Sequence, residues 1–266
     1  MGCPFFALFP GSCKHPGMSM PSYGSDFIRP PYSQTLAKLE FFILGGKNLN
    51  TNKVQLEKCI EVACKKRKAD LVIKGGTIVD VFNVALLKGD VAICDGRIAG
   101  IGRYEGEETV DASGKFIAPS FIDGHVHIES SMVTPREFAK AVLPHGVTTV
   151  ITDPHEIANV SGTEGIQFML DDSEGLDLDV LVMLPSSVPA APFENAGAEL
   201  KNAELEPFYR HPRVLGLAEV MDYPSVKNGE ETMLEKILSA HRNGKHIDGH
   251  CAGFDEEGIN VYRACG

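Results

Sequence analysis

Two histidines lie two residues apart in the run FIDGHVHI, at positions 125 and 127. The run is apolar and is typical of a β-strand, in which residues two apart point to the same side. Two neutral imidazoles on one side form a chelating pair for a divalent metal ion. Such a pair could also be packed or hydrogen-bonded inside a β structure, so His125 and His127 alone leave both interpretations open.

Two further candidates lie at the ends of later predicted strands. Glu219 is the penultimate residue of the run VLGLAEV, and His250 ends the run KHIDGH. A carboxylate among apolar neighbours is costly unless it binds a cation or has a partner. Three imidazoles and one carboxylate form a mixed nitrogen and oxygen set that suits Mn²⁺, Fe²⁺ or Zn²⁺, and a bridging carboxylate suits two ions. The alternatives are an ion pair between Glu219 and a basic residue, and a buried, hydrogen-bonded His250.

Other carboxylates and one more histidine lie near these positions. Glu129 comes two residues after His127, so it can lie on the same side of the site and act as a proton shuttle. Alternatively, it is a surface or helix-capping carboxylate. The block TDPHEI follows another strand and contains Asp153, His155 and Glu156. We expect these three residues to contact substrate, although Asp153 and Glu156 could instead cap the next helix.

Alternating strands and helices between residues 119 and 266 must position these side chains. Predicted strands at 121–128, 147–152, 179–185, 214–220 and 245–250 are each followed by a helical pattern. This alternation predicts a parallel sheet with right-handed crossovers. Five such units correspond to part of a (β/α)8 barrel or to an open doubly wound sheet. In both folds the carboxyl ends of the strands carry the site, and every candidate ligand falls at such an end.

The preceding sequence has a different texture. Residues 55–118 contain short β-branched runs separated by Gly-Gly, Asp-Gly and Ser-Gly, which predict a small antiparallel sheet. Residues 1–54 are rich in Pro, Gly, Ser and aromatic residues, and we expect a flexible leader with a short helix starting near its end, over 53–67. The chain is therefore divided into a leader (1–54), a small β domain (55–118) and part of a barrel (119–266).

Composition excludes several classes of protein. The chain has 266 residues, 43% hydrophobic, with 25 basic and 36 acidic residues and a net charge of −11. An acidic chain without a basic stripe argues against nucleic acid or an anionic membrane as partner. No apolar run approaches the ~20 residues that span a bilayer. The seven cysteines form no CxxC pair, which favours reduced thiols and a cytoplasmic location.

The motifs together resemble the amidohydrolase superfamily. The general likeness lies in DLVIKGGTIVD, DVAICDGRIAGIG and DASGKFIAPSFIDGHVH. A closer likeness, to the adenine deaminase family, lies in HIESSMVTPREFAKAVLPHGVTTVITDPHEIANVSG, GLAEVMDYP and DGHCAG. It covers residues 55–266. It implies a partial (β/α)8 TIM-type barrel of about five βα units, preceded by a small β domain. It also implies hydrolytic deamination of adenine to hypoxanthine and ammonia by a metal-bound hydroxide.

The resemblance also assigns roles. His125, His127 and His250 match metal ligands, and Glu219 takes the bridging position and is counted, with Glu129, among the catalytic residues. Two divalent ions are implied, with Mn²⁺ preferred over Fe²⁺ and Zn²⁺. The family continues past Gly266 with a strand-six histidine and a strand-eight aspartate. We therefore expect an amino-terminal part of such an enzyme, a truncated barrel that is homo-oligomeric in the full-length form.

Two other functions are possible for such a chain. One is a hydrolase of the same superfamily that acts on cyclic amides. A lysine on the fourth strand would favour it, and Glu219 argues against it. The other is a non-catalytic, truncated chain that folds poorly or binds a partner.

Overall fold

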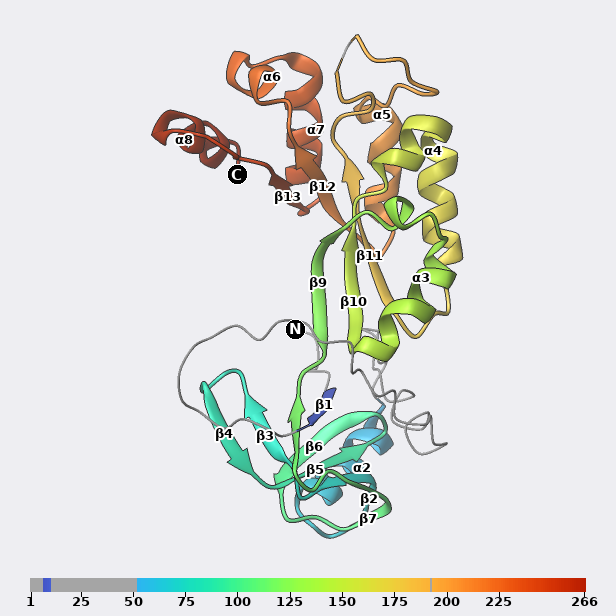
Figure 1. Cartoon of the computed structure of the whole chain (residues 1–266), viewed down its shortest axis with the longest axis vertical. Coiled ribbons are helices and arrows are strands. Elements are labelled where there is room, and N and C mark those ends of the chain that lie inside the picture. Colours follow the sequence, from blue (N-terminus) through green and yellow to red (C-terminus); the bar gives the residue numbers. More distant parts are fainter. Residues whose placement is uncertain (1–6, 11–51, 192) are drawn as a thin grey trace, which may run out of the picture. The chain divides into compact units, whose positions relative to one another are not determined.

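The computed structural model describes residues 7–10, 52–191 and 193–266 (Figure 1). The described residues up to Phe121 belong to one compact unit and those from Ile122 to Gly266 to another. Most of the expected leader, residues 1–6 and 11–51, lies outside the described residues. No helix among the described residues is long and apolar enough to cross a lipid bilayer.

The N-terminal unit begins its described main part with helix α2 (Lys53–Ala63), within the predicted range. Asn52 caps this helix by accepting a hydrogen bond from the Gln55 backbone, and the Gln55 side chain accepts one in return. The strands of this unit are β1 (Ala7–Pro10), β2 (Ala69–Lys74), β3 (Thr77–Asp80), β4 (Ala85–Lys88), β5 (Asp90–Cys94), β6 (Arg97–Gly102), β7 (Gly106–Asp111) and β8 (Lys115–Ala118).

These strands correct the prediction of a small antiparallel sheet, which was wrong. They form two sheets, in the orders β1-β8-β3-β4 and β6-β5-β2-β7, and each sheet contains one parallel pair, β3 with β8 and β2 with β7. The Gly-containing turns specify hairpins between consecutive strands, such as β5 and β6. The parallel pairs join strands far apart in the chain, and burial in a common core, with Ile78 and Ile117 both 1% exposed or less, brings them together.

The C-terminal unit contains a five-stranded sheet in the order β13-β12-β11-β10-β9. The pairs β10–β11, β11–β12 and β12–β13 are parallel. The strands are β9 (Phe121–Val126), β10 (Val147–Thr152), β11 (Asp179–Pro185), β12 (Val214–Val220) and β13 (His246–Gly249). The helices are η1 (Ile128–Ser131), α3 (Pro135–Val142), η2 (Leu143–His145), α4 (His155–Asp172), α5 (Asn202–Leu205), η3 (Glu206–Arg210), α6 (Tyr223–Asn228), α7 (Glu231–Arg242) and α8 (Glu256–Cys265).

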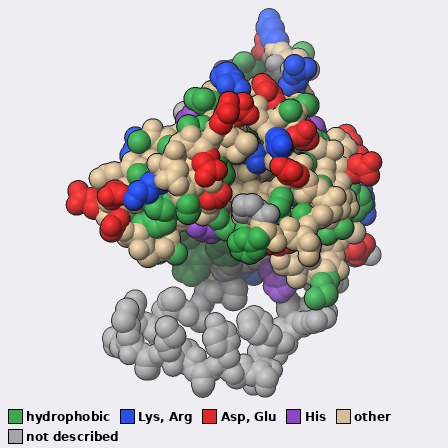
Figure 2. Space-filling view, turned by 90° about the horizontal axis from the view of Figure 1, so that it is seen from above, with side chains coloured by type: hydrophobic (Ala, Val, Ile, Leu, Met, Phe, Trp, Pro, Cys, Tyr) green, Lys and Arg blue, Asp and Glu red, His purple; other side chains and the backbone are tan. Residues whose placement is uncertain are grey.

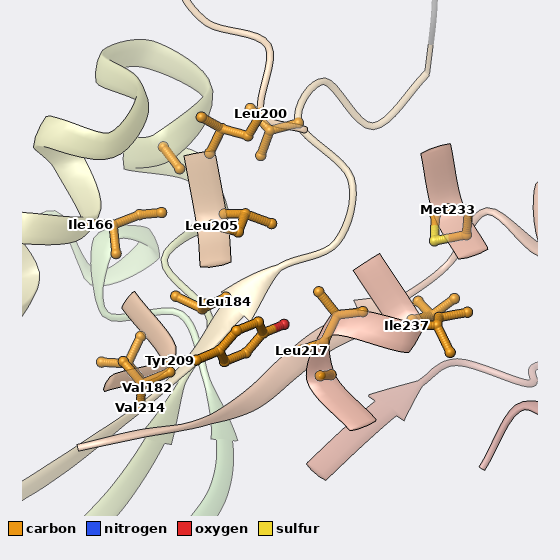
Figure 3. Close-up of a cluster of buried hydrophobic side chains, with 14 of the residues drawn as sticks. Ile166, Val182, Leu184, Leu200, Leu205, Tyr209, Val214, Leu217, Met233 and Ile237 are labelled. Carbon is orange, nitrogen blue, oxygen red and sulfur yellow. The ribbon is translucent and has the colours of Figure 1, made fainter. Parts of the chain in front are cut away.

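Each of the five strands is followed by helix, which confirms the predicted α/β fold with five units of a partial barrel. A large cluster of buried apolar side chains fixes the helices to the sheet (Figure 3). Leu217 of β12 and Ile237 of α7 belong to it, at 0% and 4% exposure. A second cluster packs Val150 of β10 with Phe138 of α3 and Met169 of α4. The strands are thereby held so that their carboxyl ends share one edge of the sheet.

On the face seen in Figure 2, acidic side chains lie interspersed with Lys and Arg.

Candidate metal centre

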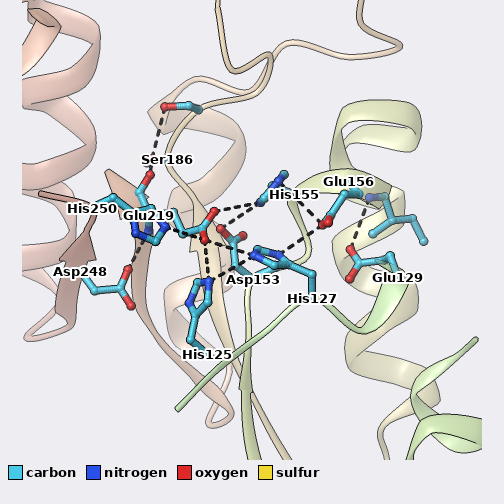
Figure 4. Close-up of polar contacts among 12 residues, drawn as sticks. His125, His127, Glu129, Asp153, His155, Glu156, Ser186, Glu219, Asp248 and His250 are labelled. Atoms are coloured by element: carbon cyan, nitrogen blue, oxygen red, sulfur yellow. Dashed lines mark hydrogen bonds and ion pairs between the residues drawn. The ribbon is translucent and has the colours of Figure 1, made fainter. Parts of the chain in front are cut away.

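Four of the predicted site residues meet at the carboxyl edge of the parallel sheet (Figure 4). His125 lies in β9, His127 follows that strand, Glu219 lies in β12 and His250 follows β13. The Nε2 atoms of His125, His127 and His250 lie 2.6, 3.1 and 3.0 Å from Oε1 of Glu219. Residues more than 90 positions apart in the sequence therefore converge on a single carboxylate oxygen.

The protons on the imidazoles are constrained by their neighbours. Nδ1 of His127 lies 3.0 Å from the backbone carbonyl oxygen of Asp153. A carbonyl can only accept, so Nδ1 carries the proton and the lone pair of the neutral ring is on Nε2. That lone pair faces Glu219 and lies 3.2 Å from Nε2 of His125. Several electron-pair donors thus point at one another, and a cation is the species that this donor set suits.

Glu219 is 5% exposed. Burial alone would raise the pKa of its carboxyl group, because a charge loses its hydration. The hydrogen bond from His250 and the electrostatic attraction of the neighbouring imidazoles outweigh burial and hold the pKa of Glu219 below its ordinary value. The carboxylate is therefore ionised, as a metal ligand must be.

A second group of residues extends from the other oxygen of Glu219. Nδ1 of His155 lies 3.3 Å from Glu219 Oε2 and 3.2 Å from Asp153 Oδ2. Asp153 is 2% exposed, and burial raises its pKa to about 6 although His155 opposes this. The hydrogen bond to Asp153 raises the pKa of His155 to about 9. The structure thus brings Asp153 and His155 into contact with the predicted metal ligands.

Glu156 and Glu129 lie at the far side of this group. Glu156 Oε2 is 3.4 Å from Nδ1 of His127. Glu129 Oε1 accepts a hydrogen bond from the Ile157 backbone in the first turn of α4, at 3.4 Å, and no contact between Glu129 and a histidine is found among the described residues. Burial raises the pKa of Glu129. The N-cap residue of α4, Pro154, makes no side-chain cap, so the capping alternative for Asp153 and Glu156 finds no support. The hydrogen bond from Ile157 instead agrees with the helix-capping alternative for Glu129.

Three buried carboxylate oxygens in this group, Glu129 Oε2, Asp153 Oδ1 and Glu156 Oε2, have no hydrogen-bond partner among the described residues. Unpaired buried oxygens are costly, and they are expected where a cation or a polar ligand completes the site.

Residues 116–266, more than half of the chain, match the sequence pattern of the amidohydrolase family. The chain belongs to the amidohydrolase family. Amidohydrolases use a binuclear centre of divalent metal ions, and the convergence of imidazole and carboxylate groups described above suits such ions. Three groups of possible ligands overlap here: His125, Glu219 and His250; Asp153, His155 and Glu219; and His127, His155 and Glu156.

Curated relatives of this amidohydrolase include adenine deaminases of Bacillus velezensis and Bacillus subtilis. They are 61% and 60% identical over 212 residues, which is 80% of this chain and 37% of each relative. The adenine deaminase of Listeria monocytogenes is 54% identical over 81% of this chain and 37% of its own length. The chain thus spans little more than a third of the length of these relatives.

Among solved structures, the atrazine chlorohydrolase TrzN of Arthrobacter aurescens, complexed with zinc, matches with a TM-score of 0.52 at 15% identity. The match covers 73% of this chain and 56% of that one. A D-aminoacylase mutant matches with a TM-score of 0.51 at 19% identity, over 73% and 48% of the two chains. These similarities concern the fold alone.

Two polar side chains at the centre of this amidohydrolase site were missed by the sequence analysis. Ser186 directly follows β11, and Asp248 lies in β13, two residues before His250. Both contact the backbone of Glu219. Both could have been predicted from their positions. Ser186 directly follows the third predicted strand, and Asp248 lies two residues before His250 and so points to the same side.

Proposed function

We propose that this chain is part of an adenine deaminase, in which His125, His127, His250 and Glu219 hold divalent metal ions, Mn²⁺ in preference to Fe²⁺ or Zn²⁺. The observation that carries the proposal is the convergence of three imidazole Nε2 atoms within 3.1 Å of Glu219 Oε1. Identity of about 60% to curated adenine deaminases over 80% of the chain supports adenine as the substrate.

The reaction adds water to C6 of adenine and breaks the bond from C6 to the exocyclic nitrogen, so adenine and water become hypoxanthine and ammonia. When bound, the metal ions supply hydroxide near neutral pH. Glu219, ionised and buried, has one carboxylate oxygen beside the three histidines and the other beside His155, and it would hold the metal ions together with these imidazoles.

The remaining residues handle protons and substrate. Glu129, whose pKa is raised by burial, retains a proton to higher pH than an exposed glutamate and is proposed to deliver it to a ring nitrogen of the purine. Asp153, His155 and Glu156 are proposed to contact the substrate, since they line the same edge beside the histidines. Hydrolysis of a cyclic amide and a non-catalytic chain are not favoured, because the curated relatives are adenine deaminases.

The metal centre is tested by Mn²⁺ binding, measured by equilibrium dialysis with elemental analysis. His250→Ala should weaken Mn²⁺ binding at least tenfold, because it removes one of the converging nitrogens. His246→Ala is the matched control, since His246 lies exposed at the start of the same strand. Equal Mn²⁺ affinity in His250→Ala and the wild-type chain would contradict the assignment.

The substrate is tested with the complete enzyme, loaded with Mn²⁺ and assayed for ammonia release. Adenine should release ammonia, and guanine and a cyclic amide such as hydantoin should not react. Turnover of hydantoin without turnover of adenine would reject the substrate. We also propose a cytoplasmic, homo-oligomeric enzyme. The free thiols of the described cysteines accord with a reducing compartment, and gel filtration with light scattering measures the assembly.

A further inference from the structure

Strand β12 is irregular at Glu219. In its pairing with β13, Leu217 lies opposite Ile247 and Val220 lies opposite Gly249, so β12 has one extra residue between the two pairs. This is a β-bulge, a feature that often redirects a side chain beside an active site. Within the bulge Glu219 has a φ of +40°, in the left-handed region that residues other than glycine rarely adopt.

The bulge determines which way Glu219 points. Side chains alternate across a strand, so in a regular β12 Glu219 would share the face of Leu217. Leu217 packs into the large core cluster, and Val220, three residues later, packs into the same cluster. The extra residue allows both to reach the core and turns the Glu219 carboxylate toward the histidines (Figure 4).

Side chains of the two neighbouring strands hold the displaced backbone. The N–H of Glu219 donates to Oδ1 of Asp248 in β13, at 2.7 Å. The carbonyl of Glu219 accepts from Oγ of Ser186, which follows β11, at 2.9 Å. Ser186 is buried, and its own carbonyl accepts from Nζ of Lys236 in α7, at 2.7 Å. Both polar groups that a bulge removes from regular pairing are thus bound by side chains.

We propose that Asp248 and Ser186 are positioning residues, whose hydrogen bonds on either side of Glu219 keep its backbone left-handed and its carboxylate aimed at the histidines. Without these bonds the backbone of Glu219 relaxes toward regular strand geometry, and the carboxylate leaves the common point of His125, His127 and His250. The proposal rests on the proposed function, because the orientation of the carboxylate matters only if Glu219 is a metal ligand.

The first test compares two substitutions at Asp248 by Mn²⁺ equilibrium dialysis. Asp248→Ala removes the acceptor and should weaken Mn²⁺ binding 10- to 100-fold, as loss of a group that orients a metal ligand does. Asp248→Asn keeps an acceptor oxygen and should stay within threefold of the wild-type chain. Asp255→Ala is the control, because Asp255 accepts a comparable backbone hydrogen bond at the start of α8, away from Glu219.

Two results would overturn the positioning role in this test. One is Mn²⁺ affinity in Asp248→Ala within threefold of the wild-type value. The other is an equal loss in Asp248→Asn, which would make the charge of Asp248 responsible in place of its hydrogen bond. Ser186→Ala should also weaken Mn²⁺ binding, by more than threefold, and an unchanged affinity would remove Ser186 from the proposal.

A second test does not depend on metal. Hydrogen–deuterium exchange of the metal-free chain, read by mass spectrometry in peptides spanning 214–221, reports the Glu219 N–H. Exchange there should be at least tenfold faster in Asp248→Ala and unchanged in Asp248→Asn and Asp255→Ala. If the wild-type chain binds no Mn²⁺, the metal centre of the proposed function is rejected, and hydrogen–deuterium exchange alone then tests the positioning role of Asp248. Unaltered exchange in Asp248→Ala would overturn the positioning role.

Discussion

Lys236 gives a prediction with a definite sign. This lysine of α7 is 7% exposed, and its Nζ donates to the backbone carbonyl of Ser186. Burial lowers its pKa to about 8 from 10.5, because the ammonium loses its hydration, and the negative charges of Glu199 and Glu204 only partly oppose this. Lys236 is thus a buried cation that the folded protein holds at a cost.

The pH dependence follows from the two pKa values. Below pH 8 the lysine is charged in both the folded and the unfolded protein. Burying the charge then costs about 3 kcal/mol, since a pKa shift of one unit corresponds to about 1.4 kcal/mol and the pKa falls from 10.5 to about 8. Between pH 8 and 10.5 the unfolded chain binds more protons than the folded protein, so this group raises the free energy of unfolding as pH rises. Relative to Lys236→Met, the wild-type chain should gain about 2 to 3 kcal/mol between pH 7 and pH 10.

Urea unfolding followed by circular dichroism at 222 nm measures this difference. Most of the described helix lies in the C-terminal unit, so the signal reports mainly on the unit that contains Lys236. Lys227→Met is the control: Lys227 is exposed, and the hydrogen bond to Glu257 raises its pKa, so its charge persists over this pH range. Parallel stability curves for wild type and Lys236→Met, within about 0.5 kcal/mol, would refute the reasoning.

Three further predictions concern other parts of the chain. Glu219→Gln should weaken Mn²⁺ binding at least tenfold in equilibrium dialysis, because the charged oxygen is lost, and undiminished affinity would contradict the metal centre. Leu217→Ala should lower the free energy of unfolding in urea by about 3 kcal/mol, because it opens a cavity in the core, and a loss below about 1 kcal/mol would contradict its packing. Lys58→Met should destabilise the N-terminal unit by about 1 kcal/mol in pulse proteolysis, because Nζ bridges Asp70 and Asp95 at 2.9 and 2.5 Å in a partly exposed site. Burial tends to raise the pKa of Asp70, but hydrogen bonds from the Asp95 backbone and from Lys58 hold it below its ordinary value. The Lys58→Met effect should therefore be present above pH 4 and vanish as the pH falls further; an effect that grows in acid would contradict the pairing.

The three central strands of the C-terminal unit were predictable because burial gives nearly continuous apolar runs with sharp ends. The predicted ranges 147–152, 179–185 and 214–220 coincide with β10, β11 and β12. The helices were harder. After the strand at 147–152 the sequence has a helical pattern only over TEGIQFMLDD, residues 163–172, which form the second half of α4. Helix α4 has a non-helical residue at Gly162. Helix α6 was missed because six residues are too few to establish a periodic pattern, although Asp222 caps it and Gly229 ends it.

That the candidate site residues lie close together was predictable for a related reason. Parallel strands bring their carboxyl ends to one edge, so polar residues at those ends meet without any knowledge of the packing between them. The partners of Glu129 were not predictable, because they depend on where α4 begins. Its carboxylate accepts from Ile157 in the first turn of that helix, which starts at His155, eight residues before the helical pattern at 163–172.

The direction of Glu219 could not be deduced from the sequence, and the reason is physical. A period of two residues assigns Glu219 to the face of Leu217, which packs against the helices, where an ionised carboxylate would be buried without a partner. Only the extra residue in the pairing of β12 with β13 reverses that assignment, and the register of a parallel pair is set by distant parts of the chain. The reversal also requires acceptors and donors for the displaced backbone, which Asp248 and Ser186 supply from the two neighbouring strands. The aim of the central carboxylate is therefore a property of three strands together, and substitutions at Asp248 or Ser186 should affect metal binding although neither residue is among the four predicted ligands.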